Sequence, residues 1–334
     1  MKPAVLVTGA TGFVGAALVR ELRSRGHRVV AFARANSPRA ELADLDLRWC
    51  DGDLLDRASL ERALAQTCEL SSAPPWVVHA AAVISYRTRD QDLQRRVNVE
   101  GTRNVLAACR GARLGRLLHV SSVVAVGHAR PRETLDEDAP YNCSELRCDY
   151  ADTKRKAECL ALEVASDLDV VVVNPGAIFG PGARGPNTVK FLRALARGPH
   201  VPFVPPGSLS VVGVRDVASG CLLTLEHGRR GRRYLLTESV WTSIDCFGLA
   251  ARLLGVRPPR WTAPGVAWKA LEFGARAIDV VASPGLLTPT AVRMLGAHFR
   301  FDSSRARTEL GWAPAPFERV LGETVDWLRS RGEL

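Results

Sequence analysis

The apolar run Val5–Thr8 leads directly into three glycines with GxxGxxG spacing, at positions 9, 12 and 15. Gly9 permits a tight turn, Gly12 lets a pyrophosphate approach the backbone, and Gly15 lets the following helix pack closely on the strand. Amides at the start of that helix face the phosphates, and the helix dipole favours their negative charge. The segment therefore predicts a strand, a turn and a helix that together bind a dinucleotide.

Strand-like and helix-like patterns alternate through the first half of the chain. Apolar runs typical of strands covered on both faces occupy residues 4–8, 28–33, 48–51, 76–80, 116–121 and 169–174, with two more at 211–214 and 234–237. Helical spacing covers residues 15–25, 55–66, 90–109 and 150–166. This alternation predicts an α/β fold built on a doubly wound, Rossmann-type parallel sheet.

The composition changes after Pro175, where glycine and proline become frequent and later helical stretches are broken by prolines. We expect a dinucleotide-binding domain over residues 1–175 together with about 208–240. Residues 176–207 and 241–334 would then form a smaller, mostly helical C-terminal lobe that binds the substrate.

Charge and cysteine content exclude several classes of protein. The 45 Lys and Arg exceed the 35 Asp and Glu, but no run of five basic residues occurs, which argues against nucleic-acid binding. A basic surface suits an anionic cofactor or substrate. The eight cysteines show neither CxxC pairs nor Cys/His ligand spacing, so we expect free thiols, a cytoplasmic location and no metal site.

The stretch 265–282 is strongly apolar, with four charged residues in it. Two interpretations remain open for this helix: it lies in a membrane interface, or it is a packed helix that covers the substrate. No stretch of 18 uncharged apolar residues occurs, so we expect no membrane-spanning helix.

The residue after the second predicted strand indicates the type of dinucleotide. NAD-binding sites usually carry a carboxylate here, which bonds the ribose hydroxyls. This chain has Arg34 instead, whose guanidinium can pair with a 2′-phosphate, and Ser37 and Arg39 are further candidates. The pattern favours NADP over NAD. Asp53, after the third strand, is expected either to bond the adenine amino group or to cap the next helix.

Tyr150 and Lys154 form a YxxxK pattern at the start of a predicted helix, which places both side chains on one face. A free tyrosine has a pKa of about 10. Because an ammonium group and an oxidised nicotinamide both favour tyrosinate, we expect the pKa of Tyr150 to fall. Such a residue can move a proton during hydride transfer, while Ser122, at the end of a strand, can bond the substrate oxygen.

Nine segments in combination carry a family resemblance: TGATGFVG (8–15), DGDL (51–54), HAAA (79–82), NVEGT (98–102), HVSSVVAVG (119–127), YADTK (150–154), NPGAIFGPG (174–182), VRDVA (214–218) and FDSSRARTELGW (301–312). With these motifs the chain resembles the extended short-chain dehydrogenase/reductase superfamily over nearly its whole length. It is most similar to the branch of dihydroflavonol reductases and 3β-hydroxysteroid dehydrogenases.

The resemblance implies roles for residues at the matching positions. Ser122, Tyr150 and Lys154 would be catalytic, and Asn98 would orient Lys154 or a relay water, unless it only stabilises a turn. The dinucleotide would be lined by Gly9, Thr11, Gly12, Phe13, Val14, Gly15, Arg34, Asp53, Leu54, Ala80, Ala81, Tyr150, Lys154, Pro175 and Ile178. Members of the superfamily often form homodimers through the helices that match residues 98–110 and 150–166, so a homodimer is expected.

Departures from the sugar-acting branches of the superfamily indicate the reaction. Ser122 is followed by Val123 and Val124 where 4,6-dehydratases carry an acid pair, and polar positions of the epimerases are apolar here. We therefore expect an NADP(H)-dependent oxidoreductase that interconverts a ketone and a secondary alcohol on a fairly apolar small molecule. The alternatives are an NAD-dependent sugar epimerase and a non-catalytic dinucleotide-binding regulator. Expected substrate contacts are Ser85, Tyr86, His128, Phe179, Asn187 and Phe191.

Overall fold

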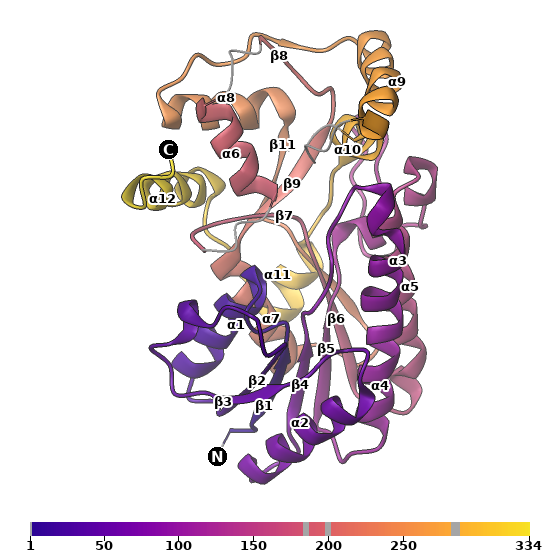
Figure 1. Ribbon diagram of the computed structural model, residues 1–334, viewed down its shortest axis with the longest axis vertical. Helices are drawn as coiled ribbons and strands as arrows, with labels where there is room; N and C mark the ends of the chain where they lie inside the picture. Colours follow the sequence, from indigo (N-terminus) through magenta and orange to yellow (C-terminus); the bar gives the residue numbers. More distant parts are fainter. Residues whose placement is uncertain (1, 183–186, 198–201, 282–287) are drawn as a thin grey trace.

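A seven-stranded parallel sheet forms the centre of the computed structural model, which describes residues 2–182, 187–197, 202–281 and 288–334. Its strand order is β10-β6-β5-β4-β1-β2-β3 (Figure 1). The strands are β1 (Val5–Thr8), β2 (Val29–Ala33), β3 (Arg48–Asp51), β4 (Trp76–His79), β5 (Arg116–Val120), β6 (Val170–Pro175) and β10 (Arg233–Leu236). The six strands expected in the first half are confirmed, and so is the doubly wound architecture.

Two apolar layers hold this sheet, because alternate strand residues point to opposite faces. On one face, Val5 and Val7 pack with helices α1 (Phe13–Ser24) and α7 (Val214–His227). On the other face, Leu6 and Val77 pack with α2 (Arg57–Leu70), α4 (Gly101–Arg110) and α5 (Asp149–Glu163). Both faces are covered, which explains why the strands are apolar at almost every position.

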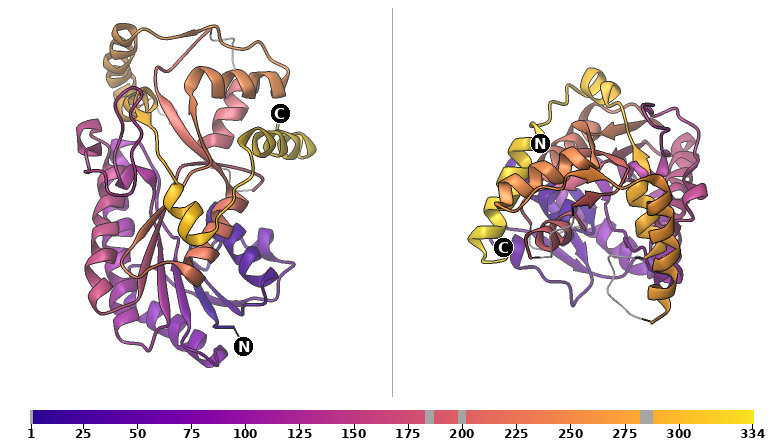
Figure 2. Two further views of the ribbon diagram at one scale, coloured as in Figure 1. Left: turned by 180° about the vertical axis from the view of Figure 1, so that it is seen from behind. Right: turned by 90° about the horizontal axis from the view of Figure 1, so that it is seen from above.

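A second, smaller sheet lies beyond the carboxyl ends of the central strands (Figure 2). It contains β11 (Ser239–Thr242), β9 (Ser208–Gly213) and β13 (His298–Phe299), with β7 (Ala177–Phe179) also paired to β9. Around it lie α6 (Asn187–Arg197), α8 (Ser243–Leu254) and α12 (Phe317–Ser330), which share one apolar core. The C-terminal part is helical as expected, but this small sheet was not predicted.

The segment 208–240 contributes to both sheets. Its first strand, β9, belongs to the small sheet, whereas α7 and β10 belong to the central one. The chain therefore crosses between the two layers inside a segment that we expected to lie wholly in the dinucleotide-binding part. The division into two binding functions remains a prediction.

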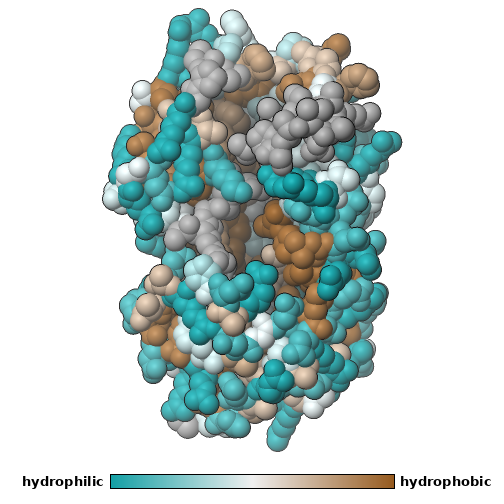
Figure 3. All heavy atoms as spheres, in the orientation of Figure 1, coloured by the Kyte–Doolittle hydropathy of each residue, from teal (hydrophilic) through white to brown (hydrophobic). Residues whose placement is uncertain are grey.

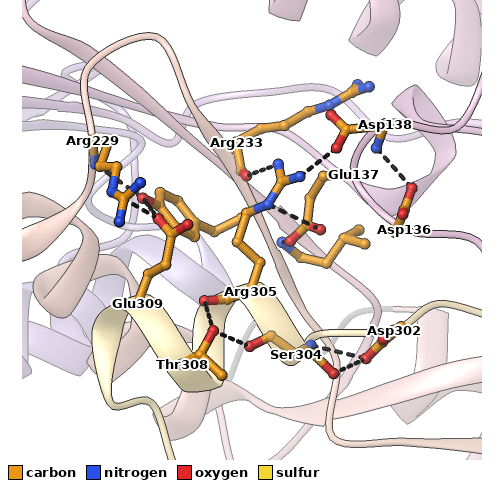
Figure 4. Close-up of polar contacts among 12 residues, drawn as sticks. Asp136, Glu137, Asp138, Arg229, Arg233, Asp302, Ser304, Arg305, Thr308 and Glu309 are labelled. Atoms are coloured by element: carbon orange, nitrogen blue, oxygen red, sulfur yellow. Dashed lines mark hydrogen bonds and ion pairs between the residues drawn. The ribbon is translucent and has the colours of Figure 1, made fainter.

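Helix α11 (Ser304–Leu310) contacts the edge strand β10 and connects the C-terminal segment to it (Figure 4). Arg305 of this helix forms an ion pair with Glu137 at 3.6 Å and another with Asp138. The same carboxylate of Glu137 accepts a hydrogen bond of 3.0 Å from the amide of Leu235. These contacts join three distant segments. They also cover β10, the edge strand of the sheet, whose backbone could otherwise pair with another chain.

The helical pattern over residues 90–109 is interrupted in the structure. A short helix α3 (Gln91–Gln94) continues as a π-helix over Arg95–Glu100 and then as α4. π-helical turns inside α-helices are frequent at functional sites. Asn98 lies in this turn, in the segment beside α5.

Neither a membrane-spanning helix nor a metal site was expected in this chain. None of the helices in the described part of the chain is long and apolar enough to cross a membrane. No group of three or more His, Cys, Asp or Glu side chains within the same described residues has the geometry to hold a metal ion.

Candidate active site

The three N-terminal glycines lie where a side chain could not fit. Gly9 has a φ of +71°, and a β-carbon there would lie 2.7 Å from the backbone nitrogen of Ala81. A β-carbon at Gly15 would lie 2.0 Å from the carbonyl oxygen of Gly9. Helix α1 begins without a side-chain cap and without an acidic residue in its first turn. This turn therefore fits a pyrophosphate, since its helix amides are not engaged by a capping side chain.

Arg34 follows β2 and is exposed, without an ion pair to any residue that the structure describes. Its neighbour Arg39 is engaged, because it forms an ion pair with Asp51 and lies 4.5 Å from the centre of the Trp49 ring. Of the two arginines, Arg34 is the one with a guanidinium available to a phosphate.

Asp53 and Leu54 lie at the end of β3, beside Gly101 of α4. The Asp53 carboxylate accepts a hydrogen bond of 2.9 Å from the amide of Leu55, so it stabilises the turn rather than the helix. Helix α2 is instead capped by Asp56. The helix-capping alternative for Asp53 is therefore wrong, and the adenine contact remains a prediction.

The remaining residues expected to line the dinucleotide lie near the carboxyl edge of the sheet. Ala80 and Ala81 follow β4 directly, close to Gly9. Pro175 ends β6, and Ile178 lies on β7. Thr11 is buried in the glycine turn, and the Phe13 ring covers Gly182. Ligands bind at this edge in open α/β sheets.

The side chain of Ser122 lies close enough to Tyr150 to lower the pKa of its phenol. Ser122 follows β5 and Tyr150 lies in the first turn of α5, where only 7% of it is exposed. Burial raises the pKa of Tyr150 to about 12, although the neighbouring Ser122 side chain acts in the opposite direction. Burial alone therefore opposes the expected fall in this pKa. That expectation also included an oxidised nicotinamide beside the phenol, so it remains a prediction.

Lys154 lies one turn after Tyr150 on α5 and is 3% exposed. Its ammonium donates a hydrogen bond of 2.7 Å to the carbonyl of Val120, at the end of β5. Burial lowers the pKa of Lys154 to about 8, and the negative charge of Glu158 partly opposes this. The bond to Val120 holds the ammonium at the end of β5, one helical turn from Tyr150.

Asn98 contacts the backbone of the loop after β4 rather than Lys154. Its Oδ1 accepts from the amide of Val83 at 2.8 Å, and its Nδ2 donates to the carbonyl of Val83 at 3.0 Å. Nδ2 also lies 3.1 Å from the Thr153 hydroxyl on α5. Asn98 therefore holds that loop against the helix of Tyr150 and Lys154, and a relay role remains a prediction.

A buried charge network lies behind Ser122, and the sequence reasoning missed it. The Asn174 amide donates to the carbonyl of Ser122 at 3.0 Å and to Glu158 at 2.6 Å. Arg233 forms an ion pair of 2.8 Å with the same carboxylate. One signal was present in the sequence: Glu158 follows Lys154 by four residues, as Lys154 follows Tyr150, so all three share one helix face.

The expected substrate residues have different surroundings. The Tyr86 ring meets the Tyr150 ring edge-on at 6.4 Å. His128 Nε2 lies 3.6 Å from Glu145, and the Ser85 hydroxyl donates to Asp90 at 2.6 Å. Tyr86 is thus an expected substrate contact that packs against Tyr150.

One of these expectations is corrected by the packing of the upper core. Phe179 is 1% exposed and its ring centre lies 4.9 Å from that of Phe317. The Phe191 ring lies 4.4 Å from that of Phe247. Both rings stabilise the small lobe. The buried Phe179 therefore faces no substrate, whereas Phe191 is half-buried and its substrate contact remains a prediction. Asn187 begins α6, and its side chain lies outside the described part of the chain.

An apolar wall surrounds Tyr150 and contains residues from distant parts of the chain. Val124, Cys148 and Met294 are buried in one cluster with Tyr150, and Tyr86 packs against them. Met294 comes from α10 (Pro289–Gly296), and no local pattern in the sequence points to it. In Figure 3 a hydrophobic surface borders the hollow between the lower and upper parts of the molecule.

Comparisons with known proteins agree with this geometry. Residues 5–236 match the profile of the family described as NAD dependent epimerase/dehydratase family. Sterol demethylase protein B of Methylococcus capsulatus is 36% identical over 333 residues, which cover 98% of each protein. A Synechocystis protein named provisionally as a dihydroflavonol 4-reductase is 34% identical over 99% of this chain and 96% of its own length. The crystal structure of gox2253 is 30% identical, with a TM-score of 0.86 and 100% of both chains covered.

Proposed function

Because this chain belongs to the NAD dependent epimerase/dehydratase family and is an oxidoreductase, we propose that it interconverts a ketone and a secondary alcohol. The substrate is a fairly apolar small molecule and the cofactor is NADP(H). The observation that carries the proposal is the Tyr150 phenol, which lies beside Ser122 and is surrounded by apolar side chains.

Tyr150 acts as the acid in the reductive direction. With a pKa of about 12 it holds its proton at neutral pH and donates it to the substrate oxygen. The Ser122 hydroxyl bonds that oxygen and stabilises its developing charge. Lys154, one helical turn away, favours the phenolate that remains after the donation. The nicotinamide, when bound, supplies or accepts the hydride.

The apolar wall supports an apolar substrate. Val124, Met294 and the Tyr86 ring lie around Tyr150, and they offer few polar groups to a sugar diphosphate. A carbonyl carried on an apolar skeleton buries its surface there and leaves only its oxygen to Ser122 and Tyr150. The names of the sterol and dihydroflavonol relatives are consistent with this class of substrate.

Arg34 supports the choice of NADP. It is exposed at the end of β2, where its guanidinium can pair with a 2′-phosphate. Asp51, the acidic residue on the neighbouring strand, is already paired with Arg39.

A panel of apolar ketones and secondary alcohols, assayed with NADPH and NADP⁺ by nicotinamide absorbance, tests the proposal. We expect net oxidation of NADPH by at least one ketone. Tyr150→Phe should lower turnover by about 10²–10⁴-fold while NADPH binding is retained. Tightly bound NAD⁺ with sugar epimerisation and no net absorbance change would instead identify an epimerase.

A further inference from the structure

Helix α9 (Gly265–Val281) presents apolar side chains on the face that points away from the protein. Val266 is 84% exposed and Phe273 is 74% exposed. They are seven residues apart, or about two helical turns, and therefore share one face. The opposite face is anchored, since Trp268 donates to the carbonyl of Val292 at 3.0 Å and Glu272 pairs with Arg293 at 2.8 Å. An outer helix face is normally polar.

The apolar surface continues into the segment before α9. Trp261 of β12 (Trp261–Thr262) is 62% exposed, and it pairs with Phe203 of β8 (Phe203–Val204), which is 47% exposed. Only four residues separate Trp261 from Val266. Both the strand pair and the helix lie at the upper end of the molecule in Figures 1 and 2, and brown spheres reach the surface there in Figure 3.

Positive charges accompany these side chains. Arg257, Arg260 and Lys269 are exposed, and none forms an ion pair with any described residue. The only acidic residue between positions 255 and 275 is Glu272, which is occupied by Arg293. The surface is therefore apolar and cationic at once. A second copy of the chain would bring six such cations together across the interface, which disfavours self-association through this face.

We propose that this surface, defined by Phe203, Trp261, Val266 and Phe273 with Arg257, Arg260 and Lys269, docks on an anionic phospholipid bilayer. Aromatic and aliphatic side chains enter the boundary between headgroups and acyl chains, while the cations meet the lipid phosphates. The helix lies in the plane of the interface and does not cross it.

The proposed membrane-binding surface is connected to the active site. Helix α9 packs on α10, whose Met294 belongs to the apolar cluster around Tyr150. Arg293 of α10 also donates to the carbonyl of Leu146 at 2.7 Å, just before the catalytic helix. If the proposed apolar substrate dissolves in lipid, docking brings the active site close to it. Membrane binding itself does not depend on that reaction, so the two proposals can fail separately.

Co-sedimentation of the whole chain with phospholipid vesicles, without substrate, tests the docking. We expect binding to vesicles that contain phosphatidylglycerol, weaker binding to pure phosphatidylcholine, and loss of binding at high salt. Trp261→Ser with Phe273→Ser should weaken binding by more than about tenfold. Lys269→Glu should weaken it by about fivefold or more. Leu93→Ser is the matched control, since Leu93 is 49% exposed on α3, outside this surface.

Retained circular dichroism and NADPH binding will show that the variants are folded. If wild-type protein does not co-sediment with vesicles that contain phosphatidylglycerol, the proposal is overturned. Equal binding by the Trp261/Phe273 variant and the Leu93 variant would overturn it as well. The oligomeric state, measured by light scattering, gives a third outcome. If the wild-type protein is a dimer that these substitutions dissociate, and it does not bind vesicles, then the surface serves self-association and the proposal is overturned.

Discussion

The side-chain amide of Asn174 donates a hydrogen bond of 2.6 Å to the carboxylate of Glu158, which has no solvent exposure. Because the same amide also donates to the carbonyl of Ser122, Glu158 is coupled to the residue whose side chain lies beside Tyr150. Glu158 also raises the pKa of Lys154 against the effect of burial. Glu158, which lies outside the YxxxK motif, thus positions Ser122 through Asn174 and raises the pKa of Lys154.

Glu158→Gln should move the high-pH limb of the activity profile to lower pH. Lys154 has a pKa of about 8, and removal of the negative charge of Glu158 lowers it further, so the ammonium form is lost at a lower pH. We expect a shift of about one pH unit, and turnover lower by roughly tenfold at neutral pH. Steady-state rates between pH 6 and 9 measure both effects. Glu163→Gln, at an exposed position on α5, should leave the profile unchanged, and an unshifted limb in the Glu158 variant would refute the coupling.

Arg34→Ser should reduce the preference for NADPH. A charge-assisted contact to a 2′-phosphate contributes about 1.5–3 kcal/mol, so the KM for NADPH should rise by roughly ten- to 150-fold. The KM for NADH should change little, and it serves as the internal control. The measurement is initial rate against each cofactor, and a parallel change in the two KM values would rule out the phosphate contact.

Gly15→Ala should damage the phosphate turn. The new β-carbon would lie 2.0 Å from the carbonyl oxygen of Gly9, so the backbone must move. We expect the Kd for NADPH to rise more than about tenfold, with a stability loss of about 1–3 kcal/mol. Gly322→Ala is the control: Gly322 lies within α12, a β-carbon added there would meet no atom within 4 Å, and this change should stabilise the protein by about 0.5–1 kcal/mol. Calorimetry and denaturant unfolding compare the two, and unimpaired NADPH binding by the Gly15→Ala variant would contradict the role of the turn.

Features that depend on neighbouring residues could be predicted from the sequence. Most of the six strands are apolar because both sheet faces are covered, so their pattern is visible in the chain itself. The glycine turn and the pairing of Tyr150 with Lys154 on one helix face follow from spacing alone.

Features that depend on packing between distant segments could not be predicted. Phe179 was expected to contact substrate, yet Phe317, far away in the chain, covers its ring. Met294 reaches the wall around Tyr150 from α10, although nothing near it in sequence carries a motif. Burial opposes the expected fall in the pKa of Tyr150, and the amount of burial is a property of the folded structure.

Arg305→Ala should destabilise the protein, and more so at neutral than at acidic pH (Figure 4). Arg305 faces Glu137, whose side chain is 3% exposed and whose pKa burial raises above its ordinary value. Without Arg305 the buried carboxylate lacks its cationic partner, a loss of roughly 2–4 kcal/mol. A raised carboxyl pKa favours the folded state below the unfolded pKa, and this contribution is lost as pH rises through the folded value. The difference from wild type should therefore shrink on acidification from pH 7.5 to 5.5, as measured by denaturant unfolding.

Adding Glu137→Gln to Arg305→Ala should recover part of the loss at pH 7.5 and remove the difference between the two pH values. Equal destabilisation by Arg305→Ala at both pH values would show that the arginine acts through Asp138 or the Arg233 carbonyl and not through the buried carboxylate of Glu137.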